Sequence, residues 1–161
     1  MTEHDELSVL PPEARPYQGT TAGIATRFTA NTIDGVIVGA ALLGAYAGYL
    51  ALRLVLDPRG FHTPDRSLAF VMVVYLDAVV VYLTIAWWFG GRTLGDRVMG
   101  LQVTSRGGGG LGFLRSFGRA VLCVIFPIGL LWCVVDPRRR SLQDIAVHSS
   151  VVYNWLPRAS S

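Results

Sequence analysis

Three long runs of hydrophobic residues dominate the pattern of apolar and polar positions along this chain. Residues 35–52 carry no charge, residues 67–89 carry one, Asp77, and residues 120–135 carry none. A helix needs about 20 apolar residues to cross the hydrocarbon core of a bilayer, so the first two runs are long enough and the third is short. The pattern predicts an α-helical integral membrane protein with two transmembrane helices.

The third run has two interpretations. It is either a third spanning helix or a re-entrant segment that is broken at Pro127-Ile128-Gly129. If it spans, the arginines divide equally between the two sides of the membrane. If it re-enters, most of them lie on the side of the N-terminus. Because arginine and lysine are enriched on the cytoplasmic side, the arginine distribution slightly favours re-entry and a cytoplasmic N-terminus.

The length and composition of the chain limit what can accompany the membrane-spanning segments. The chain has 161 residues, of which 52% are hydrophobic, so it lacks the length for an additional soluble catalytic domain. Residues Leu101–Ser105 and 145–153 have the character of strands and predict a small β element at the cytoplasmic surface. We expect a disordered cytoplasmic tail over residues 1–21, a membrane domain over 22–155 and a C-terminal tail over 156–161.

Charge and reactive side chains exclude several functions. The fourteen basic residues, all arginine, flank apolar segments rather than alternating with aromatics, which argues against nucleic-acid binding. The cysteines and histidines lack the spacing of a metal or nucleophile–base site. The glycines near residue 95 do not have the spacing of a phosphate loop. We therefore expect no enzymatic activity, no metal and no cofactor.

Ionisable residues within the predicted spans are the candidate site. Arg27 and Asp34 lie on one helix face with Asn31, and Asp77 lies near the middle of the second helix. A charged side chain at the bilayer centre costs about 2.5–3.5 kcal/mol on insertion scales, so each needs a partner or a function. For Asp77 two roles stay open: a hydrogen-bonded carboxyl that joins two helices, or a proton or cation site.

The first helix also carries a surface of small residues. Gly35-x-x-x-Gly39 and Gly44-x-x-x-Gly48 would let another helix approach closely. These glycines are candidate helix-packing positions, either within the chain or between the chain and a partner.

Three pieces of sequence together resemble a known family. They are Arg27 with Asp34, the sequence GRTLGDR at residues 91–97, and RRSLQD at residues 139–144. In order and spacing they are similar to the RDD family of small, mostly bacterial membrane proteins, which is named for one arginine and two aspartates. The resemblance covers about residues 22–153 and departs at the glycine run 107–110.

The resemblance implies which residues matter. The family arginine would be Arg27 and its first aspartate Asp34, while the second is either Asp144 or Asp77. It also implies a multi-pass protein of the bacterial cell membrane and transport of unidentified ligands, with cation/proton exchange associated with some members. Together with the residues themselves, it predicts a charge cluster at the cytoplasmic edge in which Arg27 pairs with both Asp34 and Asp144.

Two functions stay open from the sequence. The protein is either a small transporter, for instance of a monovalent cation against protons, or a non-catalytic accessory or scaffold subunit. Two or three helices do not readily enclose a pathway, so transport would require a homo-oligomer in the bilayer. A scaffold would dock a larger membrane protein through its glycine-rich faces, or anionic lipid through its arginines.

Overall fold

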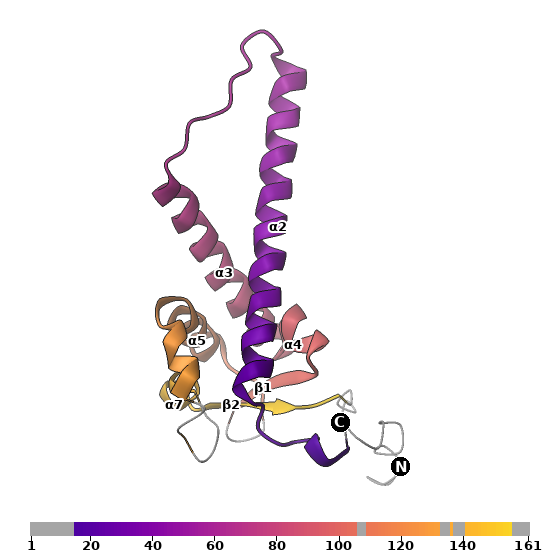
Figure 1. Ribbon diagram of the computed structural model, residues 1–161, viewed down its shortest axis with the longest axis vertical. Helices are drawn as coiled ribbons and strands as arrows, with labels where there is room; N and C mark the ends of the chain where they lie inside the picture. Colours follow the sequence, from indigo (N-terminus) through magenta and orange to yellow (C-terminus); the bar gives the residue numbers. More distant parts are fainter. Residues whose placement is uncertain (1–14, 106–108, 133–135, 137–140, 156–161) are drawn as a thin grey trace.

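Two long helices and a small cluster of short elements make up the fold. The structure is a computed structural model that describes residues 15–105, 109–132, 136 and 141–155. Helices α2 (Ile24–Leu56) and α3 (Leu68–Gly90) diverge from one another toward the connection at residues 57–67 (Figure 1). The short elements gather at the opposite end of α2 and α3. The predicted terminal tails lie outside the described residues except for residues 15–21.

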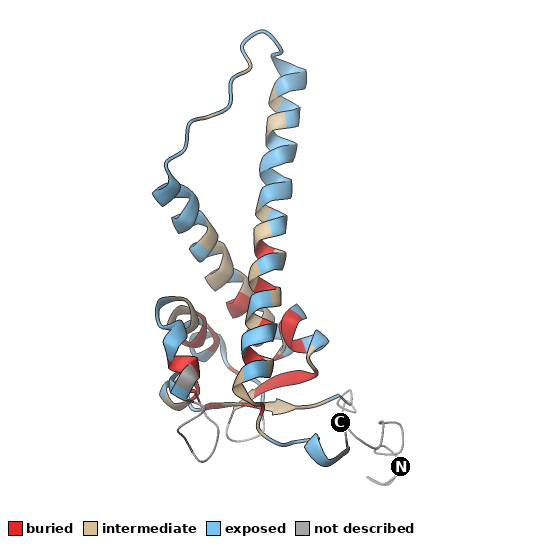
Figure 2. Cartoon of the chain, in the orientation of Figure 1, coloured by how far each residue is buried: buried red, intermediate tan, exposed pale blue. Residues whose placement is uncertain are grey.

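The two long helices are the predicted membrane spans. Both are long and apolar enough to cross a membrane. Most of their surface is exposed, and burial is concentrated where they meet the short elements (Figure 2). At 33 residues α2 is about 50 Å long, which exceeds the hydrocarbon thickness of about 30 Å. Its first turns therefore extend beyond the hydrocarbon and pack within the short elements.

The short elements form what we call the sheet unit. It contains α4 (Leu94–Val98), β1 (Leu101–Ser105), α5 (Phe113–Ile125), the 3-10 helix η2 (Pro127–Leu131), α7 (Leu142–Ala146) and β2 (Ser149–Tyr153). Strands β1 and β2 pair antiparallel, with Leu101 opposite Tyr153. The core lies between this sheet and the ends of α2 and α3, and it includes Ala30, Trp87, Leu101, Val103 and Val151.

The predicted small sheet is confirmed, with one boundary corrected. The second strand begins at Ser149 rather than at residue 145, because Leu142–Ala146 is helical. The Ser141 side chain accepts a hydrogen bond from Asp144 N, and the Asp144 carboxylate accepts one from Ser141 N. This capping box starts a helix at a position where the apolar alternation alone predicts a strand.

The third apolar run is broken. Helix α5 has 13 residues and ends at Ile125, and η2 begins at Pro127. Such a helix is about 20 Å long, and the described residues contain no third helix of spanning length. One face of α5 is buried, including Arg119 and Ala120, while Phe113, Leu114 and Phe117 are exposed. This pattern is typical of a helix at a membrane surface, although residues 133–135 lie outside the described part.

Residues 15–21, assigned to the tail by the sequence, lie against the sheet unit. Arg15–Tyr17 forms a 3-10 helix, and Thr21 bridges to Val152. Gly19 N donates to Tyr153 O at 2.8 Å, and Ala22 N donates to Val151 O at 3.0 Å. The chain therefore runs along the second edge of β2 before α2 begins.

The sheet unit contains an internal repeat. The sequences Thr93-Leu94-Gly95-Asp96 and Ser141-Leu142-Gln143-Asp144 each form a capping box that starts a helix of 5 residues. Each helix is followed by a residue with positive φ, Gly100 at 66° and His148 at 54°. A strand of 5 residues begins immediately afterwards in both cases, and these two strands pair with one another.

Candidate functional site

The candidate site residues divide into two separate groups. Arg27 pairs with Asp144 in the sheet unit, whereas Asp34 is bound by residues of α3 and α4. The predicted pairing of Arg27 with Asp144 is therefore confirmed. The predicted pairing of Arg27 with Asp34 is wrong, because among the described residues these two side chains form no ion pair. Asp77 belongs to neither group.

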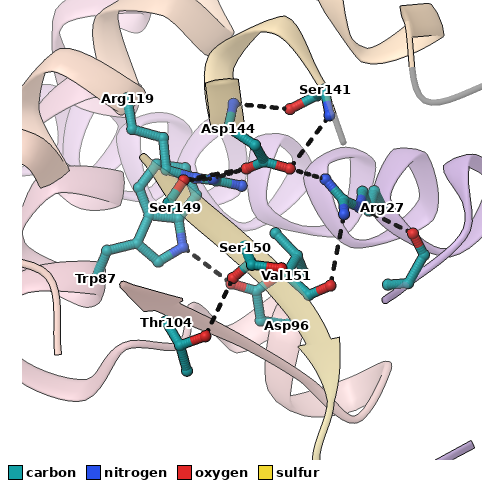
Figure 3. Close-up of polar contacts among 11 residues, drawn as sticks. Arg27, Trp87, Asp96, Thr104, Arg119, Ser141, Asp144, Ser149, Ser150 and Val151 are labelled. Atoms are coloured by element: carbon teal, nitrogen blue, oxygen red, sulfur yellow. Dashed lines mark hydrogen bonds and ion pairs between the residues drawn. The ribbon is translucent and has the colours of Figure 1, made fainter. Parts of the chain in front are cut away.

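The first group, which we call the clasp, consists of Arg27, Arg119 and Asp144. Arg27 Nη1 donates to Asp144 Oδ2, and Arg119 Nη1 donates to Asp144 Oδ1 (Figure 3). The three residues come from α2, α5 and α7, and they are 3%, 4% and 0% exposed. One carboxylate thus joins two guanidinium groups in a site that water does not reach.

Further contacts fix the clasp to the rest of the sheet unit. Arg27 Nε donates to Ala22 O at 3.1 Å, and Arg119 Nη1 donates to Ser149 Oγ at 2.7 Å. The Arg119 guanidinium lies 4.7 Å from the centre of the Trp87 ring, at a distance that gives a cation–π attraction. The clasp therefore connects both long helices with the sheet.

The charge balance of the clasp keeps Asp144 ionised. Burial alone would raise the pKa of its carboxyl, but the adjacent charges of Arg119 and Arg27 outweigh burial and hold the pKa well below its usual range. The unfolded chain has no such pairing. Its aspartate has an ordinary pKa of 3.8.

We therefore expect the folded state to lose stability in acid. A carboxyl whose pKa is lowered by folding contributes its full stabilisation above the unfolded pKa, and this contribution falls as the pH drops toward the folded value. The melting temperature in detergent should be nearly constant from about pH 7 to pH 5 and should fall below about pH 4. A melting temperature that stays constant to about pH 3 would contradict an ionised Asp144 in the clasp.

The second group surrounds Asp34 and contains no arginine. Asp34 Oδ2 accepts a hydrogen bond from Thr93 Oγ1 at 2.5 Å, and Oδ1 accepts from Gly95 N and Tyr82 Oη, each at 2.8 Å. The residue is 2% exposed. We call this arrangement of Asp34, Tyr82, Thr93 and Gly95 the Asp34 site. Its carboxylate is held by neutral donors rather than by an opposite charge.

Gly95 explains how α4 approaches the carboxylate. A Cβ atom at this position would lie 2.1 Å from Ala30 O and 2.9 Å from Asp34 Cγ. Only glycine leaves space for the backbone of α4 to reach the surface of α2. The capping box of Thr93 and Asp96 fixes the same turn, so the sequence TLGD presents both a hydroxyl and a backbone N–H to Asp34.

A small cavity of about 150 Å³ adjoins the Asp34 site between α2, α3 and α5. Asp34, Asn31, Tyr75 and Cys123 contribute its polar lining, and the other lining residues are apolar or glycine. Tyr75 Oη donates to Gly35 O at 3.1 Å. Residues with carboxylate, amide and hydroxyl groups therefore line a cavity between the two predicted membrane-spanning helices and α5.

The remaining predicted positions separate into packed and exposed ones. Gly35 and Gly39 face Tyr75 of α3. A Cβ atom added to Gly35 would lie 3.0 Å from Tyr75 Oη, and one added to Gly39 would lie 3.7 Å from Tyr75 Cε2. Gly44 and Gly48 have no described atom within 4 Å of such a Cβ. Asp77 is exposed on α3. The first glycine pair thus serves packing within the chain, whereas the second pair lies on an open surface.

Sequence reasoning missed several members of both groups. The sequence pattern assigned no role to Arg119 or Tyr82, and it gave none to Thr93 although this residue lies in the motif GRTLGDR. The repeated pattern [S/T]-L-x-D is a signal that could have identified Thr93 and Ser141 as caps. The described residues contain no group of three histidine, cysteine or acidic side chains that could hold a metal ion.

The chain matches a known protein family. The model of the RDD family matches residues 21–148. No curated protein and no solved structure matches the chain. The matched region includes Arg27, Asp34 and Asp144 and extends over both long helices and most of the sheet unit.

Proposed function

This chain belongs to the RDD family of membrane-associated proteins, and we propose that it is a small secondary transporter that exchanges a monovalent cation for protons. Asp34 is the proposed binding group for both ions. The Asp34 site and its adjoining cavity are the basis of the proposal, and the clasp is assigned a structural role.

The observation that carries the proposal is a buried carboxylate without a counter-charge beside a cavity. Among the described residues Asp34 has only neutral hydrogen-bond donors, so an ionised carboxylate there has a net negative charge to neutralise. Ionisable residues inside a membrane are expensive and commonly mark ion or proton pathways. A cation that neutralises Asp34 would compete with a proton for the same oxygens.

The cavity chemistry suits a hard cation. Asp34, Asn31 and Tyr75, whose side chains carry oxygen atoms, are among its lining residues, and carboxylate, carbonyl and hydroxyl oxygens are the ligands that hard cations prefer. Arg27 does not take part in ion binding in this proposal, because its guanidinium is occupied by Asp144. The clasp instead holds the start of α2 in place while Asp34 exchanges its ions.

We propose that the transporter is a homo-oligomer. Two long helices that diverge from one another do not enclose a pathway. Gly44 and Gly48 give α2 an open surface of small residues where a second copy could pack closely. Each of these features supports assembly in the bilayer.

We further propose a bacterial cell-membrane location with the sheet unit on the cytoplasmic side. The described arginines are unevenly distributed, and the end that carries the sheet unit has more of them. Those at this end are Arg15, Arg27, Arg92, Arg97, Arg115 and Arg119, against Arg53, Arg59 and Arg66 at the other. Positive residues favour the cytoplasmic side.

Proton flux in liposomes tests the transport proposal. The purified protein would be reconstituted with a pH-sensitive dye inside, and Na⁺, K⁺ or Li⁺ would be added outside. We expect cation-dependent proton movement with wild-type protein and at least about a tenfold loss with Asp34→Asn, because the amide cannot exchange a proton.

The matched control is Asp77→Asn, which removes an acidic group from the same membrane region without touching the Asp34 site. It should retain flux if it still assembles, and the elution volume of each variant reports folding and assembly. If well-folded wild-type oligomer shows no flux with any of the three cations, the exchange proposal fails for these ions. An accessory subunit that docks a larger membrane protein then becomes the better account.

A further inference from the structure

A second and larger hollow lies where the end of α3 meets α4. It has a volume of about 370 Å³, and its lining has two chemically different parts. Apolar side chains form one part, and two arginines form the other. The residues on which the argument rests are Ile85, Ala86, Phe89, Leu94, Arg92 and Arg97.

The apolar part faces the membrane. Ile85 and Phe89 are one helical turn apart on α3 and are 48% and 76% exposed. Trp88, next to Phe89, is also exposed and marks this end of α3 as the level of the lipid headgroups, where tryptophan is enriched. The wall from Phe89 to Ile85 therefore extends from the headgroup level toward the hydrocarbon core.

The basic part lies just beyond the end of the span. Arg97 is exposed. A Cβ atom added to Gly90, the last residue of α3, would lie 3.7 Å from Arg97 Nη2. The Arg97 guanidinium therefore extends back over the end of α3. It forms no ion pair with any residue that the structure describes. Arg92 is half-buried and donates to Gln102 Oε1 at 3.1 Å, which fixes its guanidinium at the rim. Among the described lining residues none is acidic.

We propose that this groove binds one anionic phospholipid. The phosphate lies at Arg97 and Arg92, and the first part of one acyl chain lies along Ile85 and Phe89. Guanidinium groups bind phosphate through charge-assisted hydrogen bonds, and the apolar wall at membrane depth gives the acyl chain a surface that a soluble phosphate compound would not use. The site is distinct from the Asp34 site and does not depend on transport. Tyr82 lines the groove and also donates to Asp34, so the two sites are neighbours.

Native mass spectrometry of the full-length protein in detergent micelles tests this site. The protein would be mixed with equal amounts of phosphatidylglycerol and phosphatidylcholine carrying identical acyl chains. We expect wild-type protein to retain more phosphatidylglycerol, and Arg97→Gln to lower that retention about fivefold, the effect of one basic residue at an anionic membrane surface. Arg59→Gln, which removes an exposed arginine from the connection between the long helices, should leave retention unchanged.

Two results would overturn the proposal. The first is equal retention of the two lipids by wild-type protein, and the second is an equal effect of Arg97→Gln and Arg59→Gln. A competition arm separates lipid from soluble phosphate: glycerol 3-phosphate in excess should not displace the bound lipid. Displacement would assign the groove to a soluble phosphate compound instead. The lipid preference and the competition arm use wild-type protein and hold even if a variant fails to fold.

Discussion

Asp144→Asn should destabilise the folded protein by about 3–5 kcal/mol, the cost of removing one partner from a buried ion pair. The substitution leaves Arg27 and Arg119 buried without a carboxylate between them, and both guanidinium groups are almost inaccessible to water. Thermal unfolding of the purified protein in detergent, followed by tryptophan fluorescence, would measure the loss. At this magnitude we also expect a smaller yield of folded protein.

Asp77→Asn is the matched comparison for this prediction. It makes the same chemical change at an exposed carboxyl that has no hydrogen bond to a described residue. Its melting temperature in detergent should stay close to that of the wild type. Equal stability of the two variants would show that the clasp does not hold the long helices to the sheet unit.

Gly95→Ala should destabilise the protein by about 1–3 kcal/mol or more, the usual cost of adding a methyl group to a packed interior. Helix propensity alone would predict stabilisation, because alanine is more favourable than glycine by about 1 kcal/mol inside a helix. The new Cβ would lie 2.1 Å from Ala30 O, so α4 must move away from α2 and withdraw its backbone N–H from Asp34.

Gly44→Ala is the matched control for this unfolding measurement, because it adds the same methyl group at an open position. Gly44 lies within α2 and has no described atom within 4 Å of a Cβ at this position, so the substitution should be neutral or slightly stabilising to the monomer. If Gly95→Ala proves as stable as Gly44→Ala, α4 does not approach α2 as closely as the structure describes.

The broad architecture could be predicted from the sequence because its signals are local. Long apolar runs identify the helices α2 and α3, and the strand-like character of Leu101–Ser105 identifies β1. The boundary of β2 was missed because Ser141 and Asp144 form a capping box that starts a short helix. That signal lies in polar residues, which a hydrophobic pattern does not register.

The candidate site was less predictable because its partners are distant in sequence. Helical spacing places Arg27 and Asp34 on one face, which suggested that they share a partner. In the structure Arg27 instead pairs with Asp144, and Asp34 accepts a hydrogen bond from Thr93. The partners in these two contacts are 117 and 59 residues apart in the sequence. One helix face can serve two sites when different elements pack against its successive turns, and spacing along a single helix does not reveal those elements.

The two buried carboxylates thus differ in their surroundings. Asp144 is neutralised by two arginines and connects α2, α5 and α7. Asp34 is held by neutral donors beside a cavity. A fixed clasp next to a carboxylate without a counter-charge is consistent with the proposed ion exchange, because the clasp would hold the helix that carries Asp34 in place.

Proton release on cation binding is the most direct test of the claim that Asp34 binds a proton and a cation in competition. Purified protein in weakly buffered detergent solution would be mixed with Na⁺, K⁺ or Li⁺ while a pH indicator reports released protons. We expect release from wild-type protein and from Asp77→Asn, and none from Asp34→Asn that elutes as a folded protein. Release that persists in Asp34→Asn, or its absence from folded wild-type protein with all three cations, would contradict the account.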